Sequence, residues 1–348
     1  MIGVLGGYGA VGSVALRQLA SWGIGPLRIG GRDGDRAAGL AADLTGAIEV
    51  STVDVTDAGS LARFCDGCAV VLNCAGPARH LGDRAARAAV AAGAGFVDAA
   101  GDDSLHAALA NLGTARPVVL SAGMMPGLTG LLPRYLAGPY GREQLAATRL
   151  TGYVGGRDRF TATAALDYLA VDGYGEPLAA WRDGARRSRV LVPLDGVRPP
   201  SFPEPVTAAP YLAGETERLA RRLGLGEVHW YSVFAGTRVL GALRGTGGPA
   251  QLCRAAELDL FGHEPYQHLV IELSGRIDAA LVLRGTGASA LTGAAAAIAT
   301  RAVHAGEVPG GVHHAAEVLD PAASAGLLRG SPAVRELTVA EYVEEGVL

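Results

Sequence analysis

An α/β fold is predicted, with a doubly wound parallel sheet in a first domain and an α+β arrangement in a second. Short apolar runs alternate with helical patterns from Ile2 to Ser121, which is typical of a parallel sheet with right-handed crossovers. A glycine-rich stretch, GGYGAVG, separates the first apolar run from the first helical pattern. The alternation stops near Met124, and a chain of 348 residues is long enough to form two hydrophobic cores.

Six strands are expected in the first domain. They cover Ile2–Leu5, Leu27–Ile29, Ile48–Val53, Ala69–Asn73, Phe96–Asp98 and Val118–Ser121. Between them, apolar residues from Val11 to Trp22 recur at helical spacing, and Asp57 is expected to cap a helix that runs to Phe64. Six strands connected in this way predict the two mononucleotide-binding halves of a Rossmann-type domain.

The second domain is expected to begin with a helix punctuated by proline and glycine, MMPGLTGLLPRYLAGPYG. Its expected strands are Leu145–Tyr153, Val228–Phe234, His268–Ile277 and Ala279–Gly285, and its expected helices are Phe160–Asp172, Glu215–Leu223 and Ser289–Ala305. A proline-rich connection is expected over Pro193–Pro210. We place the first domain at residues 1–125, the second at 126–305 and a C-terminal segment at 306–348.

The composition indicates a globular protein whose ligands are small molecules. The chain is 49% hydrophobic and 18% charged, which is too apolar for a disordered segment. Its net charge of −4 leaves no basic field that would gather a phosphate backbone, so nucleic acid is not an expected partner. All 30 basic residues are arginine, which excludes mechanisms that need a lysine base or a Schiff base.

We expect a cytoplasmic protein that does not enter a membrane and binds no metal. No stretch reaches about 18 uninterrupted apolar residues, and the apolar start lacks the basic region of a signal peptide. The CxxC formed by Cys65 and Cys68 has no second pair to complete a zinc site, so reduced thiols are expected.

The stretch GGYGAVG has the spacing and context of a phosphate loop for a dinucleotide. Its glycines follow a predicted strand and open a predicted helix, whose N-terminus offers free N–H groups and a positive dipole to a pyrophosphate. Gly7 allows the tight turn, Gly9 lets the phosphates approach, and Gly12 lets the helix pack on the sheet. An ordinary turn between strand and helix is the alternative. The other expected cofactor-binding residues of this loop are Tyr8, Ala10 and Val11.

The end of the second predicted strand favours NADP(H) over NAD(H). NAD-binding domains place an acidic residue there for the ribose 2′-hydroxyl, whereas this sequence has Gly30, Gly31 and Arg32. A guanidinium forms a forked contact with a 2′-phosphate, and the glycines leave room for it. Asp33 is the alternative, because its carboxylate lies one residue further and suits the acidic role.

Two later segments are expected to line the same site. Asp54 and Val55 follow the third strand, where the adenine would lie. Cys74, Ala75 and Gly76 follow the fourth strand, across the switch point from the glycine loop and near the nicotinamide ribose. A signal for the start of a helix is the alternative interpretation of Asp54.

Four stretches share a wider pattern: GGYGAVG, GGRDGDRAAGLAADL, VVLNCAGPARHLGDRAARAAVAAGAGFVDAAGD and SAGMMPGLTGLLPRYLA. They contain a glycine loop, a GR pair after the second strand, a C-x-GP segment, a G-x-x-(Y/F)-V-D strand and a helix that starts with PG. In these features residues 1–138 resemble the saccharopine dehydrogenase-like family of NAD(P)-dependent oxidoreductases. A weaker similarity returns at LTGAAAAIATRAV and VPGGVHHAAEVLD.

The resemblance implies a Rossmann domain that binds NADP(H), a substrate and dimerisation domain over residues 126–305, and a segment over 306–348 that returns to the first domain. It also implies hydride transfer to or from a C–N bond. The lack of lysine and the short, alanine-rich substrate domain distinguish this sequence from saccharopine enzymes of primary metabolism. A role in secondary metabolism is therefore expected.

Candidates to position a substrate or supply a proton lie in both domains. Each has a structural alternative: His80 follows Arg79 at the start of a helix, Asp102 caps a helix, and His229 lies on a half-buried strand. The four expected catalytic residues are His80, Asp102, Tyr153 and His229, and the further candidates are Arg79, Arg157 and Tyr231.

These features predict an NADPH-dependent reductase that acts on the C=N bond of a small amino-acid-like or secondary-metabolite substrate. Arginine side chains would bind the carboxylate of this substrate. A protonated iminium is already activated, so orientation supplies much of the rate without a strong side-chain acid. One alternative is reduction of a C=C bond, which needs an oxyanion donor such as Tyr153 or Tyr231. Another is a non-catalytic NADP(H)-sensing protein. A homodimer is expected by analogy, and a carrier protein is a partner if the substrate is tethered.

Overall fold

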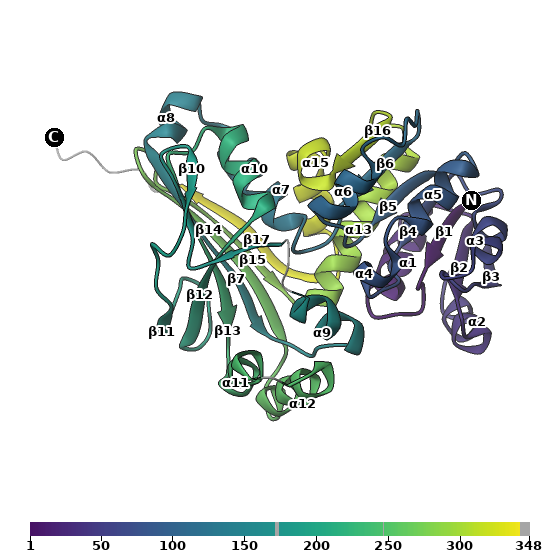
Figure 1. Cartoon of the computed structure of the whole chain (residues 1–348), viewed down its shortest axis with the longest axis horizontal. Coiled ribbons are helices and arrows are strands. Elements are labelled where there is room, and N and C mark those ends of the chain that lie inside the picture. Colours follow the sequence, from purple (N-terminus) through teal and green to yellow (C-terminus); the bar gives the residue numbers. More distant parts are fainter. Residues whose placement is uncertain (171–173, 246, 342–348) are drawn as a thin grey trace. The chain divides into compact units, whose positions relative to one another are not determined.

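The computed structural model describes residues 1–170, 174–245 and 247–341, which form two compact units (Figure 1). Among the described residues, the first unit contains Met1–Leu128 and Ser289–Ala333, and the second lies within Thr129–Ala288 and Val334–Glu341. The chain therefore passes from the first unit to the second, returns, and enters the second again.

Within the described residues, the first unit contains a seven-stranded parallel sheet (Figure 1). Its strands are β1 (Ile2–Leu5), β2 (Leu27–Gly31), β3 (Ile48–Thr52), β4 (Val70–Asn73), β5 (Gly95–Asp98), β6 (Pro117–Leu120) and β16 (Gly311–His314). Their order is β16-β6-β5-β4-β1-β2-β3, which reverses direction between β1 and β4 as in a Rossmann domain. The Rossmann-type prediction is confirmed, and β16 extends the sheet beyond the six expected strands.

Strands β1, β4 and β5 of this sheet are fully buried, as expected for parallel strands covered on both faces. This burial is why these segments read as continuous apolar runs. A Cβ on Gly293 would lie 2.6 Å from Val14 Cβ, so α13 lies directly against α1. The helices of this unit are α1 (Gly12–Ser21), α2 (Gly34–Ala42), α3 (Ala58–Cys65), α4 (Ala78–Leu81), α5 (Arg84–Ala91), α6 (Asp103–Leu109), α13 (Ala288–His304), α14 (Ala315–Val318) and α15 (Pro321–Arg329).

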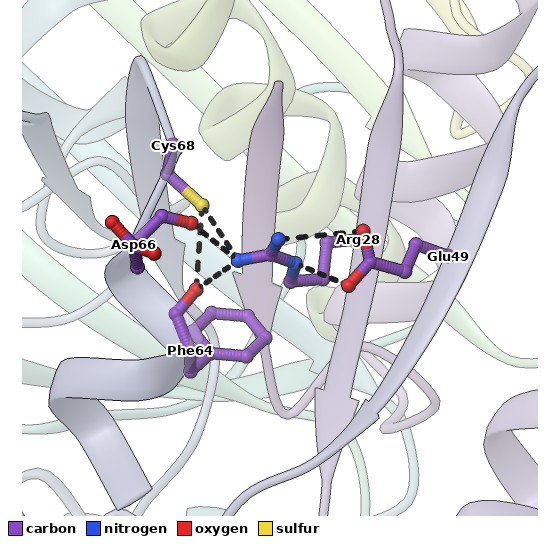
Figure 2. Close-up of polar contacts among 5 residues, drawn as sticks. All are labelled: Arg28, Glu49, Phe64, Asp66 and Cys68. Carbon is purple, nitrogen blue, oxygen red and sulfur yellow. Dashed lines mark hydrogen bonds and ion pairs between the residues drawn. The ribbon is translucent and has the colours of Figure 1, made fainter. Parts of the chain in front are cut away.

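Arg28 on β2 ties three segments of the first unit together (Figure 2). Its guanidinium makes two bonds to Glu49 on β3, at 2.9 and 3.3 Å. It also donates to the carbonyl oxygens of Phe64 and Asp66, at 2.5 and 2.7 Å, and contacts Cys68 Sγ at 3.7 Å. The last carbonyls of a helix have no partner inside the helix. Arg28 supplies that partner for α3 and joins the helix end to the β2–β3 edge.

The second unit is built on a mixed sheet, ten-stranded in the described part of the chain. The main path is β10-β9-β13-β7-β14-β15-β17, and β12 pairs with β13, β11 and β8. Only β13 and β7 among these described pairs are parallel. The strands are β7 (Thr148–Arg157), β8 (Gly175–Pro177), β9 (Ala180–Arg182), β10 (Ala185–Arg187), β11 (Leu194–Val197), β12 (Val206–Ala213), β13 (Glu227–Phe234), β14 (Tyr266–Gly275), β15 (Ala279–Gly285) and β17 (Val334–Glu341).

Two apolar clusters organise the second unit, whose α+β class is confirmed. One lies on the sheet and includes Phe202, Val233 and Val270. The other joins α9, α11 and α12 through residues such as Ala165 and Leu252. None of the described helices has the length and apolar character needed to cross a membrane. The helices that follow the first sheet are α7 (Leu128–Ala137), α8 (Arg142–Ala146), α9 (Ala162–Leu169), α10 (Gly214–Leu223), α11 (Arg238–Arg244) and α12 (Pro249–Leu260).

Several segments differ from expectation. Leu145 lies in α8, and the strand expected there begins at Thr148. The proline-rich stretch 193–210 contains β11 and much of β12, because Pro210 stays in the strand with its carbonyl oxygen accepting from Leu178 N–H. Of the expected helix Phe160–Asp172, residues 171–172 lie outside the described residues.

The C-terminal segment 306–348 does not return to the first unit as a whole. Its part up to Ala333 belongs to the first unit, where β16 pairs with β6. Strand β17 instead belongs to the second sheet, where its antiparallel register with β15 runs from Ala279 opposite Glu341 to Gly285 opposite Val334.

Candidate cofactor and substrate sites

The glycine loop joins β1 to α1 through two close backbone approaches. Gly6 has a φ of +69°, and a Cβ there would lie 2.8 Å from Ala75 N, after β4. A Cβ on Gly12 would collide with Gly6 O and lie 2.8 Å from Gly7 Cα. The first turn of α1 therefore lies directly on the loop. The tight turn expected at Gly7 has its left-handed residue at Gly6, because Gly7 packs against β2 and donates its N–H to Gly30 O.

Gly9 is the least crowded of the loop glycines Gly6, Gly7, Gly9 and Gly12. A Cβ on Gly9 would have one neighbour within 4 Å, Gly6 O at 3.1 Å. No side chain caps the start of α1 at Val11, so the first N–H groups of this helix have no side-chain acceptor. Ala10 and Tyr8 complete the loop. An open glycine beside the positive end of a helix is the donor set that a pyrophosphate needs.

Tyr8 and two arginines lie together after β2. The Tyr8 ring covers Gly31, where a Cβ would lie 2.7 Å from Tyr8 Cζ, and the Arg36 guanidinium lies 4.8 Å from the ring centroid. Asp33 Oδ1 accepts from Arg36 N–H at 3.0 Å and caps α2. The Asp33 carboxylate is thus held by the helix, whereas Arg32 and Arg36 are exposed.

Asp54 forms a local turn after β3. Its Oδ1 accepts from Thr56 N–H at 2.8 Å and Thr56 Oγ1 at 2.7 Å. These hydrogen bonds, with the charge of Arg32 as a smaller contribution, hold the pKa of Asp54 below its usual value. The helix start belongs to Asp57, which accepts from Ser60 N–H and caps α3. Val55 is half-buried against the core of the unit.

Asn73 and Asp98 form a buried pair at the carboxyl ends of β4 and β5. Asn73 Nδ2 donates to Asp98 Oδ2 at 3.0 Å. Asn73 Oδ1 accepts from Ala75 N–H at 3.2 Å, and Asp98 Oδ1 accepts from Ala100 N–H at 2.9 Å. The pair therefore fixes both the Cys74–Gly76 loop and the loop after β5.

Cys74 is half-buried beside the glycine loop, and its N–H donates to Leu5 O at 2.9 Å. Burial, followed by the nearby Asp98 charge, raises the pKa of the Cys74 thiol. The side chain therefore stays a protonated thiol, a small group near the loop rather than a nucleophile.

The expected catalytic residues fall in two places. His80 and Asp102 belong to the first unit, and Tyr153 and His229 belong to the second. His80 is exposed on α4, beside the exposed Arg79. Asp102 Oδ1 accepts from Leu105 N–H at 2.9 Å and caps α6. This is the structural role that the sequence gives as the alternative to a catalytic one. Across residues 1–170, 174–245 and 247–341, no group of three His, Cys, Asp or Glu side chains could hold a metal ion.

Tyr153 and Tyr231 stack on the second sheet. They lie opposite each other on the parallel strands β7 and β13, with ring centroids 5.2 Å apart and an interplanar angle of 13°. Burial, and then the charge of Glu272, raises the pKa of Tyr153 to about 12. Burial also raises the pKa of Glu272, which is half-buried on β14.

His229 and Arg157 are engaged by neighbouring side chains. His229 Nε2 lies 2.8 Å from Glu227 Oε1 and 3.2 Å from Arg182 Nη2, and burial lowers the pKa of His229. Arg157 makes two bonds to Glu204, at 2.6 and 3.2 Å. Its charge is already balanced, so it is a poor candidate to bind a substrate carboxylate.

Comparison with known proteins identifies the first part of the chain. Residues 2–115 match the family described as the saccharopine dehydrogenase NADP binding domain. This stretch is similar to that family's NADP-binding domains. The match confirms the resemblance seen in the motifs and confirms NADP(H) as the cofactor. It also supports an NADP-dependent oxidoreductase.

The whole chain shares its fold with a solved saccharopine dehydrogenase. The apo L-Glu-forming enzyme from Saccharomyces cerevisiae has a TM-score of 0.66 at 13% identity, over 98% of this chain and 99% of its own. At this identity the likeness shows the fold. The triphenylmethane reductase of Citrobacter sp., complexed with NADP(H), is 23% identical with a TM-score of 0.25, over 28% of this chain and 36% of its own. No curated protein sequence matches this chain.

The residues of the saccharopine dehydrogenase NADP-binding domain fit NADP(H). The open glycine and uncapped helix suit the pyrophosphate, and the guanidinium groups of Arg32 and Arg36 suit a 2′-phosphate. The sequence interpretation missed Arg36, although its position on the first turn of a helix capped by Asp33 could have indicated it. It also missed Glu272, which reads as a solvated residue within an apolar strand.

Proposed function

We propose that the chain is an NADPH-dependent reductase that transfers hydride to the C=N bond of an amino-acid-like or secondary-metabolite substrate. The saccharopine dehydrogenase NADP-binding domain supports the cofactor and the reaction class. The family resemblance implies chemistry at a C–N bond, and the Saccharomyces cerevisiae protein of the same fold is named a saccharopine dehydrogenase. When bound, NADPH supplies the hydride.

The acidic groups along the carboxyl edge of the first sheet carry the proposal. Asp98 is bonded to Asn73 and to Ala100 N–H. Asp102 caps α6, and burial raises the pKa of the Cys74 thiol. The contacts of these groups fix the backbone or a helix start, and none of them places the group as a proton donor to a substrate. A protonated iminium needs no such donor, so this edge suits it better than a substrate that must be protonated during reduction.

Within the proposal, the residues of the first unit bind and orient. The glycine loop and the start of α1 bind the pyrophosphate, and Arg32 and Arg36 bind the 2′-phosphate. The Cys74–Gly76 backbone lines the nicotinamide side. Arg79 and His80, which are exposed on α4 directly after this segment, contact the substrate carboxylate.

NADPH oxidation by the full-length protein tests the reaction. The substrates are a panel of imines that carry a carboxylate and a matched panel of enoyl thioesters. Turnover of an imine supports the proposal, whereas turnover of enoyl thioesters alone would overturn it. Saturable NADPH binding without oxidation of either panel would favour the NADP(H)-sensing alternative. A Gly12→Ala variant, which should not bind NADPH, is the control that assigns turnover to this site.

Reduction of a C=C bond is the second candidate, and the Tyr153–Tyr231 pair favours it. The raised pKa values keep both phenols protonated at neutral pH, so either could donate to an enolate oxygen. The neighbouring Glu272 carboxylate disfavours it, because a negative charge nearby opposes a developing enolate. Tyr153→Phe should abolish enoyl reduction and leave imine reduction intact.

The proposal retains a cytoplasmic homodimer and, if the substrate is tethered, a carrier protein as partner. These rest on analogy with related sheet-bearing domains. Light scattering of the purified chain measures its oligomeric state. Comparing the turnover of free and carrier-bound substrate tests whether a carrier protein is a partner.

A further inference from the structure

Ser121, His314 and Asp103 lie in a row of polar contacts in the first unit. Ser121 directly follows β6, and His314 ends the neighbouring strand β16. Ser121 Oγ lies 3.0 Å from His314 Nδ1, and His314 Nε2 lies 3.3 Å from Asp103 Oδ1 at the start of α6. The His106 ring stacks on His314, with centroids 4.7 Å apart. The sequence motifs predicted none of these contacts.

The backbone of Ser121 is strained. Its φ of +59° lies in the left-handed region, which residues with a Cβ rarely adopt. Its N–H donates to Ala100 O at 2.5 Å, and its Oγ donates to Gly101 O at 3.0 Å. Strain of this kind persists where surrounding contacts fix the residue, and it is frequent at functional sites. The contacts fix Ser121 against the loop after β5.

The hydrogen atoms of this cluster can be assigned from its contacts. Ser121 has one hydroxyl hydrogen, and the contact with Gly101 O uses it. Oγ then accepts from His314, so Nδ1 must carry a hydrogen. The other ring nitrogen, Nε2, faces Asp103 Oδ1 at 3.3 Å.

A nucleophilic role for Ser121 does not fit its surroundings, although Ser, His and Asp also occur together in hydrolases. The Ser121 residue is 1% exposed, and its hydroxyl hydrogen is used by Gly101. A substrate carbonyl could not reach Oγ at this depth. The cluster is therefore better suited to holding the backbone in place.

The loop that Ser121 holds is connected to the glycine loop by successive contacts. Ala100 N–H donates to Asp98, which is paired with Asn73. Asn73 in turn accepts from Ala75 N–H, and the Ala75 backbone lies against Gly6. The contacts run along the carboxyl ends of the strands from β16 to β1. A dinucleotide lies across this edge in a Rossmann sheet, with its two halves on opposite sides of the switch point.

We propose that His314, acting through Ser121, is a positioning residue for the nicotinamide half of bound NADP(H). The proposal rests on the NADP(H)-dependent function proposed above. His314 and Ser121 hold the backbone of residues 99–102 at the carboxyl edge, on the β4–β5 side of the switch point. Arg32 and Arg36 lie after β2, on the other side, so the adenine half does not depend on His314.

Two ligands separate this role from a merely structural one. NADPH occupies both halves of the site, whereas adenosine 2′,5′-bisphosphate occupies only the adenine half. In the full-length protein, His314→Ala and Ser121→Gly should each raise the Kd for NADPH about tenfold, the equivalent of one net hydrogen bond, without changing the Kd for the bisphosphate. Ser121→Gly also removes the backbone strain, so it remains informative if His314→Ala folds poorly.

Conservative and control variants complete the test. His314→Asn keeps a donor close to the position of Nδ1 and should restore most of the NADPH affinity. His304→Ala and Ser104→Ala change exposed residues of the same unit and should bind both ligands as the wild type does.

The inference is overturned if both ligands weaken equally or if neither His314→Ala nor Ser121→Gly changes NADPH binding. A wild-type protein that fails to bind the bisphosphate would reject the NADP site itself, and this inference with it. Failure of every imine substrate would reject the proposed reaction alone, because these binding measurements use no substrate.

Discussion

Asp33 accepts a hydrogen bond from the backbone N–H of Arg36 at 3.0 Å, and this bond starts α2 directly after the second strand of the first sheet. The carboxylate that could have bound a ribose 2′-hydroxyl is thereby held in a helix cap. The guanidinium groups of Arg32 and Arg36 are left exposed at the same place. A 2′-phosphate would meet two cations and one engaged carboxylate there.

Replacing these arginines should change cofactor preference. Arg32→Ala and Arg36→Ala should each weaken NADPH binding by about 10- to 100-fold, because each removes a charge-assisted bond to the 2′-phosphate. NADH binding should not change, and Arg32→Asp should favour NADH further. Fluorescence titration with both cofactors measures this. Arg17→Ala, which alters an exposed ion pair with Asp43, is the matched control. Equal losses for NADPH and NADH would contradict the assignment.

The glycines of the loop should differ in what they tolerate. Gly12→Ala places a Cβ against Gly6 O and should lower the free energy of unfolding by about 1–3 kcal/mol and abolish NADPH binding. Gly9→Ala places its Cβ 3.1 Å from Gly6 O, a milder crowding than at Gly12, so it should cost less stability than Gly12→Ala but still weaken NADPH binding. A Cβ on Gly39, on the exposed side of α2, would have no neighbour within 4 Å, so Gly39→Ala should raise the free energy of unfolding by about 0.5–1 kcal/mol. Thermal unfolding and NADPH titration on the same samples decide between these outcomes.

Asp102 should behave as a helix cap rather than as an acid. Asp102→Asn keeps an acceptor for Leu105 N–H and should retain both stability and activity. Asp102→Ala should cost about 1 kcal/mol of stability. If Asp102 donates a proton during the reaction, Asp102→Asn should instead lose about 10²-fold or more in kcat. The comparison of the two variants in kcat and in urea unfolding therefore separates the roles.

Removing Arg28 should destabilise the first unit. Arg28→Ala removes the guanidinium donor from the carbonyl oxygens of Phe64 and Asp66, leaving Phe64 O the weaker Cys68 thiol at 3.5 Å, and should lower the free energy of unfolding by about 2–4 kcal/mol. Arg28→Lys should recover only part of this, because an ammonium group cannot reach Glu49 and both carbonyls in a planar fork. Urea unfolding measures the change, with Arg17→Ala expected to cost less than about 1 kcal/mol. If Arg28→Ala lost as little free energy of unfolding as Arg17→Ala does, the contacts of Arg28 with Glu49, Phe64 and Asp66 would have no structural role.

His268 should make the protein less stable in mild acid. Burial, and next the charge of Arg284, lowers the pKa of His268 to about 4. The usual pKa of histidine is about 6.5, so between pH 6.5 and 4 the unfolded chain takes up a proton that the folded chain does not. The free energy of unfolding should therefore decrease as the pH falls from 6.5 to 4. His268→Leu should flatten this dependence, whereas the exposed His304→Leu should leave it unchanged; identical slopes in all three proteins would refute the account.

The first sheet and its phosphate loop were largely predictable, because local sequence determines them. β1, β4 and β5 are buried throughout, and glycines mark the turn that follows β1. Strand β16 was not predicted, since the segment GVHH at the edge of the sheet has one aliphatic side chain. The sequence of β12 favours a connection instead, because Pro210 within it and Pro203 and Pro205 just before it obscure the alternation of its side chains.

The candidate site was predictable only where it depends on backbone and spacing. The glycine loop and Arg32 follow from position alone. The engagement of Arg157 by Glu204, 47 residues away, depends on the tertiary fold. The same is true of the contact between Ser121 and His314, which are 193 residues apart in sequence. Such partners decide whether a charged or polar side chain is available, and a single sequence does not contain that information.

The late positions of β16 and β17 in the sequence affect how the chain folds during synthesis and where it can be truncated. A ribosome completes residue 128 long before it reaches β16, so until then β6 presents an unpaired edge. Likewise β15 waits for β17, which follows β16 along the chain. The two sheets thus gain these strands one shortly after the other. A piece cut after residue 128 would carry the glycine loop but expose an edge that favours aggregation.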